Sequence, residues 1–409
     1  MKFRSLVQKF FVFVLCLTAA TAAAGQKAAG NELRQEKLLN GLKVLIWSDP
    51  SATDVKVSIR VHSGAAFDPQ GKEGLMKLLS ENILPTPASR EFFTEDLGGT
   101  LEIITNYDYI QINGTARSSE FLTLLETLAQ AVTNPTIDKD NTAALKKSLT
   151  EKLAVLEKDP SYIADQAAAK RLFGTFPYGR PSMGSLESLQ RIDPTDLVLA
   201  KQRFLSADNA TVAILGNFNN DLAFRAVRRY FGAWLKSDKR VPATFRQPDA
   251  PDTKPVQIAV PGANPPQSSF ALRGLARNDP DYFAAAVLEK VLRMRSAKAA
   301  PGAAVSHDAR MLPGVVTVRY SGSAGFPFSL FTDRISESEF AQARNEAITE
   351  FLKRSVIDQW LDADTYRTSP ASEASGFQKL SVADVQRAAD RLAKNPIVSV
   401  VVTPAGATE

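Results

Sequence analysis

A polar, proline-rich stretch divides the sequence into two halves that have a similar order of strand and helix patterns. The stretch runs from residue 241 to residue 255 and contains four prolines, a composition typical of an interdomain linker. Residues 33–240 before it and residues 256–404 after it each mix strand-like runs with amphipathic helices. This organisation predicts two α+β domains, each a sheet packed against helices, with the shortened second domain a diverged copy of the first.

Local patterns predict the elements of both halves. Residues 55–62 (VKVSIRVH) alternate apolar and polar side chains, as a half-buried strand does, and Asn40-Gly41 indicates a hairpin. Residues 74–84 and 118–132 have helical spacing. The other predicted elements are strands at 100–105 and 109–116, helices at 139–157 and 162–173, a strand at 210–215, a helix at 222–234, strands at 256–260 and 268–274, a helix at 281–292, a strand at 315–320, helices at 338–353 and 382–393, and a strand at 397–402.

The N-terminal segment has the features of a secretory signal peptide in the expected order. The first nine residues carry three basic side chains, residues 10–18 are almost entirely apolar, and residues 22–24 supply an A-x-A cleavage site. The apolar run is shorter than the roughly 20 residues that span a bilayer. We therefore expect residues 1–24 to be removed on export, leaving a periplasmic or secreted chain without a membrane span. An uncleaved membrane anchor is the alternative.

Export also removes charge and the single cysteine. Loss of Lys2, Arg4 and Lys9 lowers the formal net charge from +5 to +2, which gives no electrostatic reason to expect nucleic acid or an anionic membrane as partner. Loss of Cys16 leaves a mature chain without a disulfide, a thiolate metal site or a cysteine nucleophile.

A series of short motifs follows in a specific order along the first half. They are NGLKV at 40–44, GAAFD at 64–68, GKEGL at 71–75, LGG at 97–99, PYGRPSMG at 177–184, DNATVAILGNF at 208–218 and FGAW at 231–234. Together they resemble the insulinase/pitrilysin family of zinc peptidases, which includes the subunits of mitochondrial processing peptidase. The resemblance implies two homologous sheet-and-helix domains, a zinc cofactor and peptidase activity.

The residues that carry this chemistry in the family are absent. In the family, a helix carries H-x-x-E-H, in which two histidines bind zinc and the glutamate activates the bound water. Aligned on Gly74-Leu75, those positions are Lys77, Ser80 and Glu81. The glutamate that completes the metal site aligns with Lys152, or with Glu151 if the alignment shifts by one residue.

Lysine cannot replace a zinc ligand, because its ammonium group has donors and no lone pair. Two interpretations of these positions are open: Lys77 and Lys152 form ion pairs with Glu81 and Glu151, or they lie on a solvated face. No other zinc site can be assembled from His62 and His307, which are the only histidines and are expected to be structural. No motif for another reaction is present, so we expect no catalytic residue, no bound metal and no cofactor.

Because no catalytic residue is expected, the sequence predicts a function other than catalysis. In the family, two copies of the two-domain unit enclose a chamber, and where the copies differ, one often keeps the zinc and the other does not. We therefore predict an inactive subunit that shapes the chamber, helps to bind peptide and pairs with a zinc-bearing homologous subunit. The alternative is a stand-alone peptide-binding or assembly protein of the cell envelope.

Two further sites are implied by the resemblance. The region from Gly99 to Ile103, which includes Thr100, Leu101 and Glu102, aligns with a strand that adds substrate peptide to a sheet edge; an ordinary core strand is the alternative. In bacterial relatives the second half supplies an arginine and a tyrosine that position substrate. Arg293 and Arg295 stand near the expected arginine, but no tyrosine follows at the matching distance.

Overall fold

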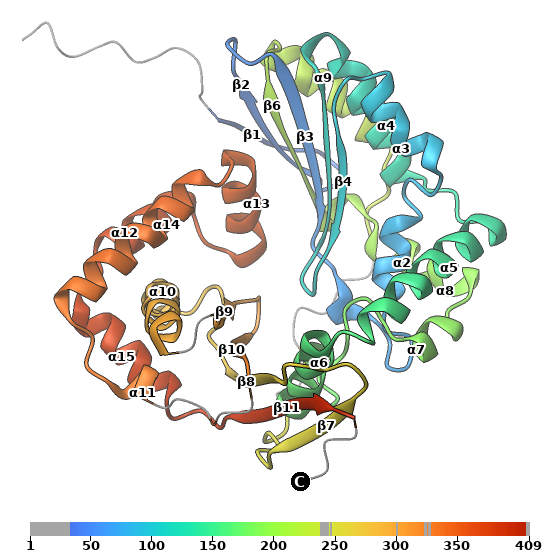
Figure 1. Ribbon diagram of the computed structural model, residues 1–409. Coiled ribbons are helices and arrows are strands. Elements are labelled where there is room, and N and C mark those ends of the chain that lie inside the picture. The colour runs from blue at the N-terminus through green and yellow to red at the C-terminus, as the bar shows by residue number, and fades with distance from the viewer. Residues whose placement is uncertain are drawn as a thin grey trace, which may run out of the picture.

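The protein is built around two separate β-sheets (Figure 1). The computed structural model describes residues 33–237, 245, 248–299, 302–322, 325 and 329–405. The predicted signal peptide and part of the predicted linker lie outside these residues. Across the part of the chain that is described, no helix combines the length and apolar character needed to cross a membrane.

The first sheet has six strands in the order β1-β2-β6-β3-β5-β4. The strands are β1 (Arg34–Lys37), β2 (Lys43–Ser48), β3 (Asp54–Val61), β4 (Leu101–Thr105), β5 (Ile110–Arg117) and β6 (Ala210–Gly216). Only the β2–β6 pair is parallel, and the hairpin signal at Asn40-Gly41 falls between β1 and β2. This order leaves β4 at one edge of the sheet.

The second sheet repeats this arrangement with five strands in the order β7-β11-β8-β10-β9. The strands are β7 (Val256–Val260), β8 (Gln267–Arg273), β9 (Ala304–Asp308), β10 (Val315–Ser321) and β11 (Val398–Pro404). Again one pair is parallel, β7–β11, which corresponds to β2–β6, and the others are antiparallel. Each strand therefore has a counterpart in the first sheet, and β1 is the one addition, as expected for two homologous α+β domains.

Helices connect and cover the strands. Those of the first half are α2 (Leu75–Glu81), α3 (Pro87–Glu95), α4 (Phe121–Thr133), α5 (Lys139–Leu156), α6 (Pro160–Phe173), α7 (Leu186–Gln190), α8 (Pro194–Phe204) and α9 (Asn220–Phe231). Those of the second half are α10 (Tyr282–Ala299), α11 (Ser329–Thr332), α12 (Glu337–Lys353), α13 (Val356–Tyr366), α14 (Pro370–Gln378) and α15 (Val382–Leu392). Short 3-10 turns lie at Ala65–Phe67, Ser118–Glu120, Pro177–Gly179 and Ala207–Asn209.

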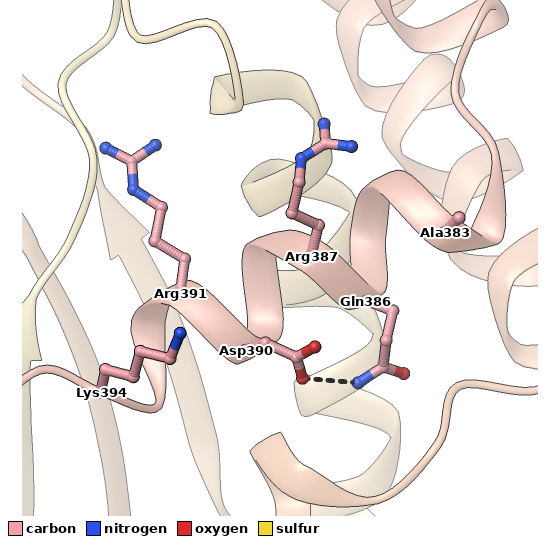
Figure 2. Close-up of a pocket in the computed structure, with 6 residues that line it drawn as sticks. All are labelled: Ala383, Gln386, Arg387, Asp390, Arg391 and Lys394. Carbon is pink, nitrogen blue, oxygen red and sulfur yellow. Dashed lines mark hydrogen bonds between the residues drawn. The ribbon is translucent and has the colours of Figure 1, made fainter.

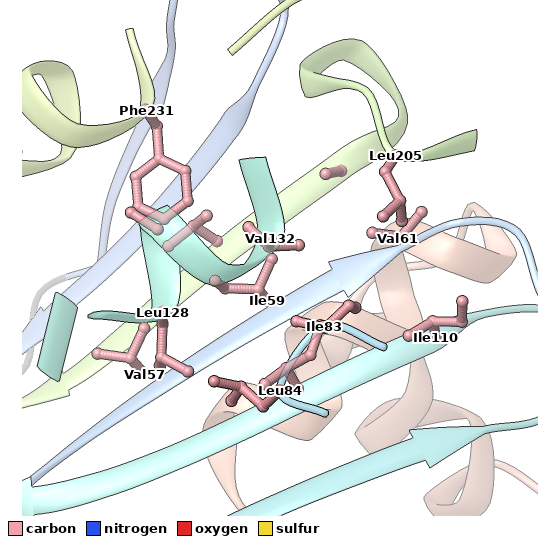
Figure 3. Packing of buried hydrophobic residues seen from close by; sticks show 14 of the residues in the cluster. Val57, Ile59, Val61, Ile83, Leu84, Ile110, Leu128, Val132, Leu205 and Phe231 are labelled. Atoms are coloured by element: carbon pink, nitrogen blue, oxygen red, sulfur yellow. The ribbon is translucent and has the colours of Figure 1, made fainter. Parts of the chain in front are cut away.

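The predicted alternation in β3 separates two different faces of the first sheet. Val57, Ile59 and Val61 are fully buried on one face, where they meet Leu128 and Val132 of α4 (Figure 3). Successive side chains of a strand point to opposite faces, so Lys56, Ser58 and Arg60 lie on the other face. One face therefore forms the main apolar core, and the other is polar.

Each half contributes a helix to the sheet of the other half. Helix α6 packs against β8 and β11 of the second sheet, and Ala164, Ala168 and Leu172 form an apolar cluster with strand residues there. In return, α13 packs on the polar face of the first sheet, where Ile357 and Leu361 contact an apolar island of β2 and β6. The sequence did not predict α13, so it missed this exchange.

A buried arginine joins α13 to the first sheet. Arg60 is 1% exposed. Its Nη1 donates to Asp362 Oδ1 at 2.7 Å, its Nε donates to Gln111 Oε1 at 2.7 Å, and its guanidinium lies 3.8 Å from the ring centroid of Tyr109. Asp362 also accepts from Arg354. Because a buried charge must be paired, these bonds hold the two halves together.

A second buried carboxylate fixes the start of α2. Asp68 accepts from the backbone N–H groups of Gly74 and Met76, each at 2.8 Å. Gly74 has a φ of +91°, and a Cβ there would lie 2.7 Å from the carbonyl oxygen of Met183, so only glycine fits this turn. Arg180 donates to the backbone carbonyl of Asp68 at 2.8 Å. The GKEGL and PYGRPSMG motifs therefore meet at this point and position α2.

We predict that Asp362→Asn will lower the free energy of unfolding by about 3 kcal/mol, because it removes the buried charge that balances Arg60. Urea denaturation followed by circular dichroism measures this change. Asp390→Asn is the matched control, since Asp390 is exposed on α15 and bonds only Gln386 among the described residues; its effect should stay within about 0.5 kcal/mol. Equal effects of the two substitutions would contradict the structural role of Asp362.

The stability of the protein should depend on the proton of Asp68. Burial raises the pKa of Asp68 from 3.8 to about 7, against the backbone N–H groups that favour the ionised form. Between these values the folded chain keeps a proton that the unfolded chain has released. The contribution of Asp68 to the free energy of unfolding therefore falls as pH rises from about 4 to about 7, by at most about 1.4 kcal/mol per pH unit.

Urea denaturation of the wild type and of Asp68→Asn across this range tests the effect, because the difference between them cancels the other titrating groups. We expect the wild type to lose stability relative to the variant as pH rises. Parallel curves would show that Asp68 does not titrate in this window.

Candidate functional site

The positions that align with the H-x-x-E-H motif hold a cluster of charged side chains. Lys77 Nζ lies 2.5 Å from Glu81 Oε1, one turn along α2, and Glu81 Oε2 also accepts from Arg90 of α3. Burial opposes ionisation of Glu81, but the bonds from Lys77 and Arg90 outweigh it and lower its pKa below the usual value. Glu81 is therefore ionised at neutral pH, and its group with Lys77 and Arg90 is called here the α2–α3 charge cluster.

Ser80 stands where the family has its general base. The residue is fully buried, its Oγ donates to the carbonyl oxygen of Lys77 at 2.7 Å, and it shares a 2.7 Å hydrogen bond with Thr105 Oγ1 at the end of β4. A hydroxyl at pH 7 does not accept a proton from water as a carboxylate does. Because Ser80 is buried and bonded on both sides, it also cannot reach a substrate as a nucleophile. Its role is to tie α2 to β4.

Lys152 and Glu151 are both exposed on α5, and neither takes part in an ion pair within the described residues. Of the two ion pairs considered from the sequence, the structure therefore contains Lys77–Glu81 only. Helical spacing places Lys152 beside the buried residues Leu149 and Leu153, whereas Glu151 points to the opposite side of α5. The two possible alignments of the third zinc-ligand position, on Lys152 or on Glu151, therefore use different sides of α5.

These side chains do not fit a zinc ion. Zinc sites are built from histidine, cysteine and carboxylate ligands, and here one carboxylate is already shared by two cations. In the part of the chain that the structure describes, no group of three or more His, Cys, Asp or Glu side chains is arranged to hold a metal ion. No reaction step through zinc can be derived for this chain.

The strand next to the cluster has a free edge. β4 pairs only with β5 in the sheet, and α2 and α3 both contact it (Figure 1). Thr100 O accepts from Thr115 N at 2.9 Å, and Asn106 N donates to Tyr109 O at 3.0 Å. Hydrogen-bonded pairs alternate in an antiparallel ladder, so the backbone groups of Leu101 and Ile103 point away from the sheet.

Gly99 and Glu102 complete the segment predicted to bind peptide. A Cβ on Gly99 would lie 2.0 Å from the carbonyl oxygen of Thr115, so glycine lets the chain enter the edge strand closely against β5. Glu102 is exposed and accepts from Asn113 at 3.0 Å. The segment therefore lies on an edge strand and not in the interior of the sheet, where a core strand would be.

The two histidines lie in different halves of the chain, and each forms hydrogen bonds with neighbouring residues. His62 bonds Thr211 at 3.0 Å and Thr365 at 3.2 Å, between the first sheet and α13. His307 accepts from the backbone N–H of Leu275 at 3.1 Å, and burial lowers its pKa. Both contact patterns are structural.

Arg293 and Arg295 are engaged within the second half. Arg295 bonds both carboxylate oxygens of Glu339 and three backbone carbonyls, which join α10 to the start of α12. Arg293 pairs with Glu289 and, at 3.3 Å, with Glu346. Helix α10 contacts other elements of the second half, so these partners give no support to a substrate-positioning role in this conformation.

A surface hollow on α15 is lined mainly by charged side chains. Arg387 and Arg391 line it together with Gln386, Asp390 and Lys394 (Figure 2). Both arginines bond aspartates, Arg387 with Asp281 and Arg391 with Asp279 and Asp281. Their charge is therefore already balanced, and the hollow offers no specific chemistry.

Sequence reasoning missed two members of the α2–α3 region. Arg90 lies on α3, which was not predicted, and Thr105 ends a strand that was predicted without its contact to α2. A local signal was present for α3, because Thr86-Pro87 is a helix start and Thr86 caps Ser89 N. The pairing of Arg90 with Glu81, nine residues away, has no sequence pattern of its own.

Two family models match adjacent parts of the chain. The model described as Insulinase (Peptidase family M16) matches residues 43–185, and the model described as Peptidase M16 inactive domain matches residues 191–297. Among curated proteins, an uncharacterized zinc protease of Mycobacterium leprae is 23% identical over 222 residues, 53% of this chain and 50% of that protein. One of Bacillus subtilis is 20% identical over 205 residues, 49% of this chain and 50% of that protein. The chain thus spans about half the length of the curated relatives it matches.

Solved structures share the fold over most of the chain. A protease from Helicobacter pylori superposes with a TM-score of 0.84 at 15% identity, covering 92% of this chain and 100% of that one. A peptidase M16 inactive domain from Pseudomonas fluorescens gives 0.81 at 18% identity, covering 92% and 99%. With this shared fold and with family models matched from residue 43 to residue 297, the chain belongs to the insulinase family of zinc peptidases, peptidase family M16.

Proposed function

We propose that this protein is the non-catalytic subunit of an exported insulinase-type peptidase. It pairs with a zinc-bearing relative, forms part of the wall of the peptide chamber and binds peptide along β4. The observation that carries the proposal is the contrast within one small region. The helix, the edge strand and the turn that position a zinc site are all in place, while the ligand positions hold the α2–α3 charge cluster.

Loss of the catalytic groups leaves the peptide-binding geometry intact. A peptide that adds to a sheet edge is held by backbone hydrogen bonds, which need no metal and little side-chain identity. The outward backbone groups of Leu101 and Ile103 supply such bonds. The active site for cleavage must then come from another chain, which is why a zinc-bearing partner is part of the proposal.

The match to a model described as an inactive domain supports this view, as does the presence of zinc proteases among the relatives. Export is proposed on the N-terminal pattern, and a periplasmic or secreted location follows from it. A stand-alone envelope protein that binds peptides would share the edge strand but would need no partner.

Restoring the ligands tests whether the site has been located correctly. Lys77→His, Ser80→Glu, Glu81→His and Lys152→Glu together recreate the family's ligand set, and we expect this variant to bind about one zinc ion per chain while the wild type binds none at stoichiometric level. Metal analysis after dialysis measures it.

Two control variants make the zinc result specific. Lys152→Glu alone should bind no zinc, because it lacks both histidines. The variant that retains Lys152 but carries the other three substitutions binds zinc tightly only if Glu151 is the third ligand. Stoichiometric zinc in the wild type, with peptide cleavage that a chelator abolishes, would overturn the non-catalytic assignment.

Partner capture tests the functional proposal directly. We expect the tagged full-length chain, purified from the envelope of its native host, to bring down a homologue that contains H-x-x-E-H, in about equal amounts as judged by mass spectrometry. The combined preparation should cleave peptides, and the chain alone should not. Recovery of peptide-binding activity with no zinc-bearing homologue would favour the stand-alone alternative.

A further inference from the structure

The α2–α3 charge cluster carries an excess of positive charge. Lys77 and Arg90 share the single carboxylate of Glu81. No other acidic side chain forms an ion pair with either cation in the part of the chain that is described. Because Glu81 remains ionised at neutral pH, the cluster keeps a net charge of about +1.

Both cations retain unused hydrogen-bond donors. Lysine has three N–H donors, and among the described residues Lys77 Nζ bonds only Glu81. Arg90 uses Nε for the carbonyl of Leu84 and Nη2 for Glu81, which leaves its Nη1 donors without a described partner. The side chains are 18% and 37% exposed for Lys77 and Arg90. The donors can therefore meet a ligand without a change in the fold.

The α2–α3 charge cluster lies next to β4, on the side of the first sheet that carries the helices. Leu101 and Ile103 pack against the main core, on the side of the sheet that carries the helices. Thr105, two residues further on, bonds Ser80 of α2 on the same side. Glu102 alternates to the opposite face, where Asn113 bonds it, so it does not neutralise the cluster. A peptide laid along β4 would present every second side chain to the helix side.

We propose that the α2–α3 charge cluster binds a carboxylate of an extended peptide held along the free edge of β4. This inference rests on the proposed function, in which β4 binds peptide, and it adds the class of ligand: an acidic peptide. Charge-assisted hydrogen bonds from an ammonium and a guanidinium suit a carboxylate. In zinc-bearing relatives this position holds a metal ion that polarises a peptide bond. In this subunit the same position holds a site for an anion.

The carboxylate has two possible sources in a peptide, an acidic side chain and the free C-terminus. Four fluorescent peptides of one extended sequence distinguish them: one with a central Glu and an amidated C-terminus, one with Gln in place of Glu and amidated, one with Gln and a free C-terminus, and one with Lys and amidated. Fluorescence anisotropy with the full mature chain, and with its partner complex where that is isolated, measures the dissociation constants.

We expect a peptide with a carboxylate to bind at least about fivefold more tightly than the neutral amidated peptide at low salt, and the Lys peptide to bind more weakly than the neutral one. The difference should shrink as salt is raised, because screening weakens the interaction of partly exposed charges. Whether the Glu peptide or the free C-terminus shows the gain identifies the source.

We expect two substitutions within the cluster to change the preference for a carboxylate peptide in opposite directions. Arg90→Gln should remove most of the preference for a carboxylate. Glu81→Gln should increase the preference at least about threefold, because it raises the net charge of the cluster from about +1 to about +2. A merely structural role would make both variants weaker. Arg191→Gln is the matched control, since Arg191 is exposed directly after α7 and pairs with Glu187; it should bind like the wild type.

The outcomes separate this inference from the proposed function. Equal binding of all four peptides, unaffected by Arg90→Gln, would overturn the carboxylate site while leaving peptide binding along β4 in place. Failure of every peptide to bind, with the chain alone and in complex, would overturn both the site and the peptide-binding part of the proposed function. A preference for the Lys peptide would overturn the carboxylate site alone. Thermal unfolding of each variant confirms that it is folded.

Discussion

Neutralising Arg60 is the constraint on which the arrangement of the two halves depends. A guanidinium that is 1% exposed in the middle of a sheet is tolerated only where an opposite charge meets it. That charge is Asp362, 302 positions later in the chain. The buried charge of Arg60 in the first sheet therefore has no opposite charge to pair with until α13 has docked. Around this pair the interface is polar, with His62 and Lys43 bonded to Asp364 nearby, so the two halves meet in a fixed register that apolar packing alone would not set.

The candidate site is a compact structure and not a gap left by missing ligands. Glu81 links α2 to α3 through Arg90, and Ser80 links α2 to β4 through Thr105. The same groups that exclude zinc therefore hold the helix and the edge strand together. Since Asp68 also fixes the start of α2, the geometry of the region depends on the protein alone. This explains how a family scaffold can keep its form and its binding edge without its metal.

Much of the fold followed from the sequence, because alternation and helical spacing are local signals. The strands at β3 and β7 and the long helix α5 were placed within one or two residues, and the α+β duplication was confirmed. The misses have a physical cause. Helix α3 is short, and α13 packs on the sheet of the other half through a mixed face that buries Asp362 and Thr365 beside Ile357 and Leu361, so an apolar pattern alone does not reveal it. The Lys77–Glu81 pair was one of two interpretations that the sequence left open, whereas Arg90 and Asp362 act through contacts that only the folded chain creates.

The exchange of α6 and α13 has a consequence for how such a protein can arise. Each sheet is completed by a helix that belongs to the other half of the chain. Two copies of a single ancestral unit, each inserting one helix into its neighbour, would form a domain-swapped dimer with this geometry. Joining their ends through a linker would turn that dimer into one polypeptide. In this view the halves are former subunits that became one chain while still bound to each other, and neither is a module that can be detached whole.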